Sequence, residues 1–103
     1  MFKTRKRRIK EECWNLDIEL VKWLNEHLAI FLEDSRKFVD LSYHKYKYKG
    51  KEYTLEECIE MLIEDTWFML NDDLYEAGAT KEIEFHKKRM FELLNLTFWQ
   101  LWW

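Results

Sequence analysis

Proline is absent from this 103-residue chain, and glycine occurs only twice, as Gly50 and Gly78. Because both residue types break helices and form turns, their scarcity favours long helices joined by few sharp turns. Charged residues interrupt every long apolar run, which argues against a membrane-spanning segment. The basic N-terminus also lacks the apolar stretch of a signal peptide. We therefore expect an all-α protein of the cytoplasm.

Cysteine and histidine are also scarce, and their spacing fits no metal site. We expect Cys13 and Cys58 to be buried thiols without a disulfide. His27 falls on an apolar stripe and is expected in the core, His86 falls in a basic band and is expected in solvent, and His44 lies in a connecting segment. Glycine-rich phosphate loops and Ser/His/Asp groupings are missing. We expect neither covalent catalysis nor a cofactor.

The apolar content of 48% suits a single domain, residues 1–103, with one core and a basic N-terminal arm of residues 1–10. Apolar residues recur every three or four positions from Ile9 to Phe31, which predicts a helix that ends near Lys37. Either Thr4 caps this helix within the arm, or Asn15 caps a later start. A second apolar set on the same helix predicts that it contacts two neighbours: Val21, Trp23, Ile30 and Leu32.

Two further helices follow in the sequence. Thr54 and Glu57 have the spacing of a capping box, which predicts a helix from Leu55 that ends at residues 77–79. Thr80 is the expected N-cap of a third helix. Three helices of this length predict a small antiparallel three-helix bundle.

The segment 38–53 joins the first two of these helices and alternates tyrosine with lysine around Gly50. A two-stranded ribbon of this size is marginal by itself. We therefore interpret the segment as a loop, with a fourth short helix near Tyr43 as the alternative.

The chain ends in a cluster of aromatic residues, and the last turns of the third helix are apolar on nearly all sides. Such a helix is buried or shared with another molecule. We expect Phe98, Leu101 and Trp102 to pack into the bundle. Trp99 and Trp103 should face outward, toward a second subunit or a partner, so that homo-oligomerisation completes the core.

Charge is distributed unevenly along the chain. The first ten residues carry six Lys and Arg residues, whereas the segment from Glu52 to Thr80 contains nine acidic residues and no basic one. The acidic helix is expected to present a carboxylate face to a basic partner surface: Glu56, Glu57, Glu60 and Glu64. A basic and aromatic patch is the candidate site for an anionic ligand or nucleic acid: Tyr46, Lys47, Tyr48, Lys49, Lys51, Lys87, Lys88 and Arg89.

One acidic pattern has a catalytic interpretation. Glu57-x-x-Glu60 followed by Asp73-x-x-Glu76 is similar to the paired motif with which all-α nucleotide pyrophosphohydrolases hold Mg²⁺. The second pair falls where its helix should end, and acidic runs on helices are normally solvated. We therefore expect a solvated face and no enzyme, and keep a Mg-dependent hydrolase as an alternative.

Three segments carry a resemblance to a known group: Trp14-Asn15-Leu16-Asp17, the helix from Ile59 to Trp67, and the aromatic ending from Phe91 to Trp102. Over residues 13–103 the chain resembles small all-helical bacteriophage and prophage proteins. The resemblance implies a phage-encoded accessory protein in a bacterial host cell. We expect it to act by protein–protein interaction on a host factor, for example as an anti-defence inhibitor. The alternatives are an oligomeric sponge for a small anionic ligand or nucleotide, and a nucleic-acid-binding protein that uses the basic arm and the Tyr/Lys connector.

Overall fold

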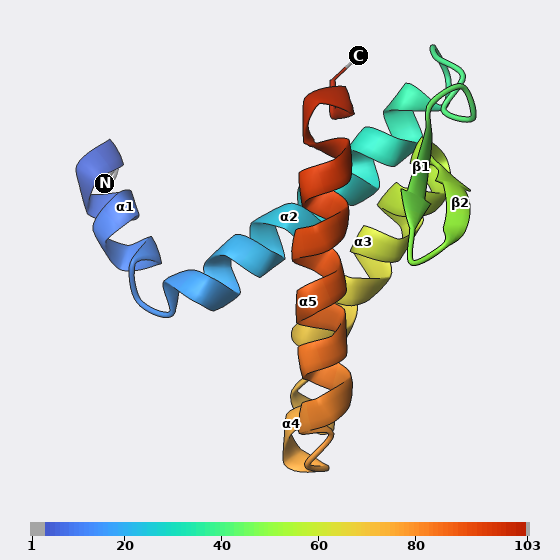
Figure 1. The fold of residues 1–103 in the computed structure, drawn as a ribbon. Coiled ribbons are helices and arrows are strands. Elements are labelled where there is room, and N and C mark those ends of the chain that lie inside the picture. The colour runs from blue at the N-terminus through green and yellow to red at the C-terminus, as the bar shows by residue number, and fades with distance from the viewer. Residues whose placement is uncertain (1–3, 103) are drawn as a thin grey trace.

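The computed structural model describes residues 4–102, and most of them are helical (Figure 1). The expectation of a helical protein is confirmed, although a small two-stranded sheet makes the all-α assignment inexact. The elements in chain order are α1 (Arg5–Glu12), α2 (Leu16–Ser35), β1 (Lys45–Tyr48), β2 (Lys51–Thr54), α3 (Leu55–Met69), α4 (Asp72–Glu76), α5 (Thr80–Thr97) and a 3₁₀ turn, η1 (Phe98–Gln100).

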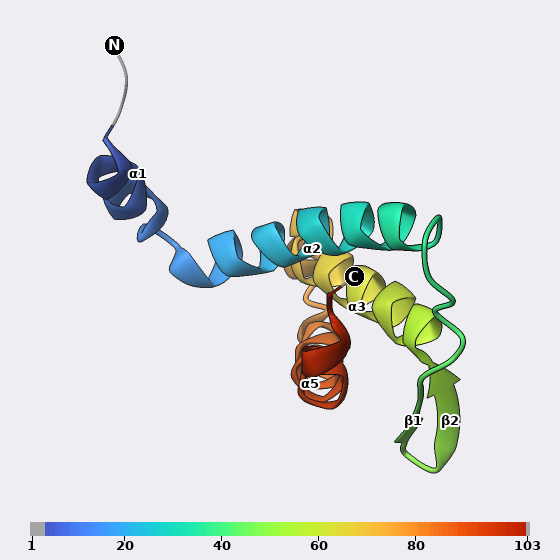
Figure 2. The same ribbon diagram turned by 90° about the horizontal axis from the view of Figure 1, so that it is seen from above.

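The first predicted helix is two helices. The hydroxyl of Thr4 accepts a hydrogen bond from the backbone of Arg7 at 3.2 Å and caps α1. Asn15 then adopts a left-handed conformation, with φ of 56°, and its side chain makes no capping bond to α2. Both predicted starting points are therefore helix boundaries. The break directs α1 and the first turns of α2 away from the rest of the molecule (Figure 2).

Helix α3 lies at the centre of the fold. It packs against α2 and against α5, whereas α2 and α5 scarcely approach each other. Figures 1 and 2 show that α5 crosses α2 steeply and does not run alongside it. Three long helices do share one core, but the arrangement is more open than the antiparallel bundle that we expected. The fully buried apolar side chains of this core are Cys58, Ile59, Leu62, Met90 and Leu93.

The segment between α2 and α3 is a β-hairpin, so the loop interpretation is wrong. β1 and β2 pair in antiparallel register, and the turn between them places Lys49 and Gly50 at φ of 49° and 80°. The hairpin gains its stability by docking, because Tyr46, Tyr48 and Tyr53 pack against the core. Among the described residues, no helix forms in residues 36–44, where a fourth short helix was the alternative. The additional short helix is α4, which follows α3.

The capping box at the start of α3 is confirmed. The hydroxyl of Thr54 accepts from the backbone of Glu57 at 3.2 Å, and the Glu57 carboxylate accepts from the backbone of Thr54 at 2.9 Å. These bonds from Thr54 hold the pKa of Glu57 below its usual value. The predicted cap at Thr80 is wrong, because the N-cap of α5 is Ala79, whose carbonyl accepts from Ile83 at 3.1 Å.

Helix α3 ends earlier than predicted. It stops at Met69, and the side chain of Asn71 accepts hydrogen bonds from Asp73 and Leu74 to begin α4. An asparagine in this position satisfies backbone donors that would otherwise lack a partner at the start of a helix. The change of direction at Asn71 places α4 beneath the first turn of α5 (Figure 1).

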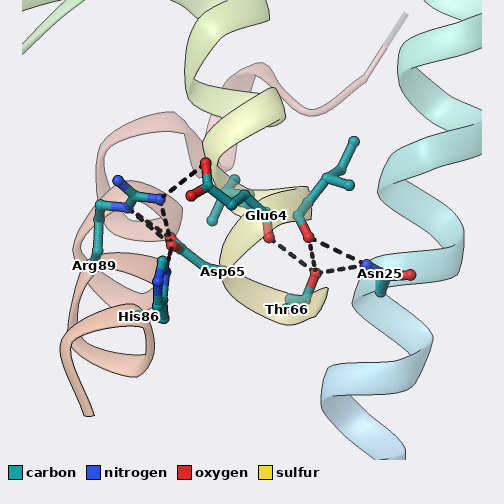
Figure 3. A network of polar contacts seen from close by, with 8 residues as sticks. Asn25, Glu64, Asp65, Thr66, His86 and Arg89 are labelled. Carbon is teal, nitrogen blue, oxygen red and sulfur yellow. Dashed lines mark hydrogen bonds and ion pairs between the residues drawn. The ribbon is translucent and has the colours of Figure 1, made fainter. Parts of the chain in front are cut away.

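Two polar clusters fix α3 to its neighbours (Figure 3). On one side, Asn25 of α2 donates from its amide to the hydroxyl of Thr66 at 3.0 Å and to a backbone carbonyl of α3. On the other side, Asp65 of α3 bonds His86 and Arg89 of α5. Because Asp65 and Thr66 are fully buried, both clusters are satisfied inside the protein and fix how the three helices cross.

Candidate functional site

An apolar groove lies between α2 and the end of α5. It exists because α2 and α5 diverge after each has packed against α3. Its volume is about 980 Å³, which is in the range of pockets that bind ligands or side chains of a partner. Glu26 and Asp34 are the carboxylates on its wall. The apolar and aromatic lining comes from both helices and from the turn after α5: Leu20, Trp23, Leu24, Leu28, Ile30, Phe31, Phe91, Leu94, Phe98, Trp99, Leu101 and Trp102.

Large aromatic side chains in this groove are exposed to an unusual degree. Trp99 is 80% exposed, Trp102 is 73% exposed and Phe98 is 57% exposed. The prediction that Phe98 and Trp102 pack into the bundle is therefore wrong, while Leu101 does pack partly against the core. The reason is that α5 ends at Thr97 and the 3₁₀ turn η1 redirects the chain.

The two outermost tryptophans were expected at an interface. Trp99 faces outward, and its role in an interface stays a prediction. Trp103 lies outside the described residues.

The sequence predicted only part of the environment of the α2 wall of the groove. The second apolar set on this helix predicted two neighbours, yet α3 covers one side, and Trp23 and Ile30 are 55% and 58% exposed on the other. His27 is also exposed on this wall, so its expected place in the core is wrong. Its ring stacks on Trp23 at 3.9 Å between centroids, and its Nδ1 donates to the Trp23 carbonyl at 2.7 Å. The stacked pair holds the Trp23 indole on the wall.

The predicted acidic face of α3 is largely engaged within the molecule. Arg36 of α2 forms ion pairs with Glu56 and with Glu60, the latter at 2.9 Å. Glu57 is exposed but is committed to the helix cap. The side chains of Glu60 and Glu64 are 53% and 54% exposed, and a role of this acidic face in partner binding stays a prediction.

The predicted basic patch is divided by the fold. The Arg89 side chain is 14% exposed, contacts Asp65 and lies 3.7 Å from Glu64. Burial alone would lower the pKa of Arg89, but the hydrogen bonds and charge of Asp65, together with Glu64, raise it. Lys87 pairs with Glu84 at 2.7 Å. Arg89 is therefore part of the core lock and is not available to an anionic ligand, whereas Lys88 is exposed.

A smaller cleft of about 260 Å³ lies beside the hairpin and includes Lys47, Lys49 and Glu92. The hydroxyl groups of Tyr46 and Tyr48 are buried, and burial raises the pKa of both. Their rings pack against the core and do not stand free to stack on nucleic-acid bases. The Glu92 carboxylate in the cleft further disfavours an anion between the two lysines. The remaining hairpin lysines, Lys45 and Lys51, are exposed.

His86 forms a cluster with Asp65 and Arg89 that resembles catalytic machinery in composition. His86 was expected in solvent, but it is only 7% exposed, and its Nδ1 lies 2.6 Å from a carboxylate oxygen of Asp65. The ring of Phe68 stacks on His86 at 4.1 Å, and Phe85 packs at its edge. The two phenylalanine rings close these sides of the cluster, and the cluster joins α3 to α5.

The acidic pairs of the hydrolase interpretation lie on different helices, with Glu57 and Glu60 on α3 and Asp73 and Glu76 on α4. Within residues 4–102, no group of three or more His, Cys, Asp or Glu side chains could hold a metal ion. In the same range, no helix is long and apolar enough to cross a membrane.

The two cysteines differ in environment. Cys13 is exposed, contrary to prediction, because α1 and the turn after it leave the core. Cys58 is fully buried on α3, and burial together with the charge of Glu57 raises the pKa of its thiol to about 11. Cys58 is therefore not a nucleophilic thiol with a lowered pKa.

Comparisons with known proteins add no functional evidence, so the groove is the main indication of function. No protein-family model, no curated protein and no solved structure matches this chain.

Proposed function

We propose that this chain is a non-enzymatic binding protein and that its apolar groove is the surface that binds a protein partner. The observation that carries the proposal is the exposure of Trp23, Phe91, Trp99 and Trp102 around one cavity of about 980 Å³. Burial of each large aromatic side chain is favourable by about 25 cal/mol per Å² of apolar surface removed from water. Contiguous apolar surfaces of this kind mark interaction sites.

The walls of the groove indicate the chemistry of the partner. Two diverging helices form an elongated apolar cleft, which suits an amphipathic helix that inserts large apolar side chains at every third or fourth position. Glu26 and Asp34 are the charged residues on the wall. A partner helix with Lys or Arg beside its apolar face would complement them.

The resemblance to bacteriophage and prophage proteins supports a bacterial setting for this interaction. We propose that the chain is a phage-encoded accessory protein and that the partner is a host factor, such as a component of a defence system. The groove then acts by occupying an apolar segment that the host factor needs for its own contacts.

The test is capture of partners from bacterial lysate with the intact protein and two variants. Trp99→Ser combined with Trp102→Ser removes apolar surface from the groove, whereas Trp67→Ser removes a tryptophan that is 55% exposed on α3 and does not line it. We expect a specific host protein to be retained by the wild type and by Trp67→Ser and to be lost with the double variant. Equal retention by all three proteins would contradict the proposal.

A further inference from the structure

We propose that the groove of one molecule receives the N-terminal arm of a second copy of this chain, and that the exchange is reciprocal. The arm is defined here as residues 5–20: helix α1, the turn at residues 13–15 and the first turns of α2. This inference concerns self-association and goes beyond the proposed function, which concerns a different protein. Both partners use the same groove, so the arm of the second copy and the host segment compete for it.

The arm is exposed to solvent along most of its described length. Every residue from Arg5 to Ile18 is exposed, and α1 contains no buried residue. Figure 2 shows the arm extending past α3 and α5. An isolated helix of fewer than about 12 residues is marginal in water, and α1 has 8 residues. Its stability therefore calls for a contact that the single copy does not provide.

Large apolar side chains occur along the arm from Ile9 onward. Trp14 is 80% exposed, Leu16 is 60% exposed and Ile9 is 48% exposed. Trp14 lies at the turn between α1 and α2. From this position its indole can enter a cavity, whereas a straight helix would pass over the cavity without filling it. The arm thus carries the large apolar anchors that the groove is shaped to accept.

A single molecule does not place its arm in its own groove. Leu20 forms the near end of the groove, and the left-handed Asn15 turns α1 away from α5 beyond that point. Figures 1 and 2 both show α1 far from the C-terminal turn. The groove of another copy is therefore the site that the arm fits.

Charge complementarity identifies a second copy as the occupant. Residues 5–15 carry five Lys and Arg residues and two Glu residues, a net charge of +3, whereas residues 16–102 carry a net charge of −7. The charged residues on the groove wall are Glu26 and Asp34, and Asp34 lies 3.8 Å from an exposed lysine, Lys37. The basic arm and the acidic groove attract each other between copies.

Reciprocal exchange also closes the assembly. Each copy has one arm and one groove, so two exchanges about a two-fold axis leave neither surface uncovered and do not propagate into a filament. A stable dimer needs about 800 Å² buried on each partner. A buried tryptophan or phenylalanine supplies about 150–250 Å², so Trp14 of one arm together with the exposed aromatic residues of one groove reaches this range.

The test exchanges charge between arm and groove in the full-length protein. An arm-reversed variant carries Arg5→Glu and Arg8→Glu, and a wall-reversed variant carries Glu26→Lys and Asp34→Lys. The control carries Lys81→Glu and Lys88→Glu, which make the same charge change as the arm reversal at exposed positions of α5 outside the groove. Sedimentation equilibrium reports the mass of each protein alone and of the two reversed variants mixed, and circular dichroism checks that each is folded.

We expect the wild type and the control to be dimers. Each reversed variant alone should show a dimer dissociation constant raised about tenfold or more, because like charges then face each other across both arm–groove contacts. The mixture should recover the dimer, because the reversed arm and the reversed groove are complementary only between the two variants. In addition, Trp14→Ser should weaken the dimer without any change of charge.

Three results would overturn the inference. One is a wild type that remains monomeric at every concentration, another is a mixture that fails to recover the dimer, and the third is a control that weakens the dimer as much as the arm reversal does. Because none of these measurements involves a host protein, their outcome is separate from that of the capture experiment.

Discussion

Arg89 donates from Nε and Nη2 to the carboxylate of Asp65 at distances of 2.6–3.1 Å, although the two residues are 24 positions apart in the sequence. Asp65 is fully buried, so its carboxylate depends on this guanidinium and on the contact with His86 for polar partners. The pair joins α3 to α5. It therefore holds one wall of the groove in place.

Removal of Arg89 should destabilise the protein strongly. Loss of one partner from a buried ion pair leaves an uncompensated charge and costs about 3–5 kcal/mol. We expect Arg89→Met to lower the free energy of unfolding in urea by about this amount. Lys88→Met changes the neighbouring exposed lysine and should alter stability by less than about 0.5 kcal/mol. Similar stabilities for the two variants would show that the pair does not hold the fold.

The capping box sets the start of α3. Thr54→Ala removes the hydroxyl that accepts from the Glu57 amide and should lower the free energy of unfolding by about 1 kcal/mol. Thr54→Ser keeps the acceptor and should retain most of that stability. Chemical denaturation distinguishes the two variants, and an alanine variant as stable as serine would contradict the role of the cap.

The same cap makes a contribution that depends on pH. Because hydrogen bonds from Thr54 lower the pKa of Glu57 in the folded state, its stabilising effect is present above the unfolded pKa and is lost as pH falls through the folded one. Glu57→Gln should therefore reduce the loss of stability on acidification. Urea denaturation of both proteins at a series of pH values measures this difference, and parallel curves would exclude it.

The two thiols should react very differently. At pH 8 a thiol reagent should modify the exposed Cys13 and leave Cys58 unmodified until the protein unfolds, because burial raises the Cys58 pKa to about 11. The Cys13→Ser variant isolates the buried thiol and should show no fast reaction. Since the folded pKa lies above the usual thiol value of 9.0, the contribution of Cys58 to stability should decline between pH 9 and about 11. Rapid modification of Cys13→Ser would contradict the burial.

The hairpin turn depends on Gly50. Its φ of 80° is a left-handed conformation that costs a residue with a β-carbon about 1–2 kcal/mol, although a methyl group there would meet no atom within 4 Å. Gly50→Ala should therefore lower the free energy of unfolding by about 1 kcal/mol. Gly50→Asn should be milder, because asparagine tolerates this conformation. An alanine variant with unchanged stability would show that the turn can relax.

Local signals in the sequence predicted the helices well. The capping box of Thr54 needs only four consecutive residues, and the long apolar periodicities of α2, α3 and α5 need only their own segments. The hairpin was missed because its stability comes from Tyr46 and Tyr48 packing on distant helices. Local propensity does not contain that contact.

The site was harder to predict for a similar reason. The aromatic ending was identified, but its exposure depends on the 3₁₀ turn after Thr97 and on the steep crossing of α2 and α5. His86 and Arg89 looked like a solvated basic band because their partner, Asp65, lies on another helix. Ion pairs between helices decide which charged side chains remain free. The periodicity within one helix does not reveal those pairs.

The central claim is that the groove is a protein-binding surface and that a second copy of the chain covers it. Oxidative footprinting of tryptophan side chains over a series of protein concentrations tests this most directly. The account predicts that Trp14, Trp23, Trp99 and Trp102 become protected as the concentration rises, while Trp67 on α3 stays equally reactive. Unchanged reactivity of all five tryptophans at every concentration would contradict it.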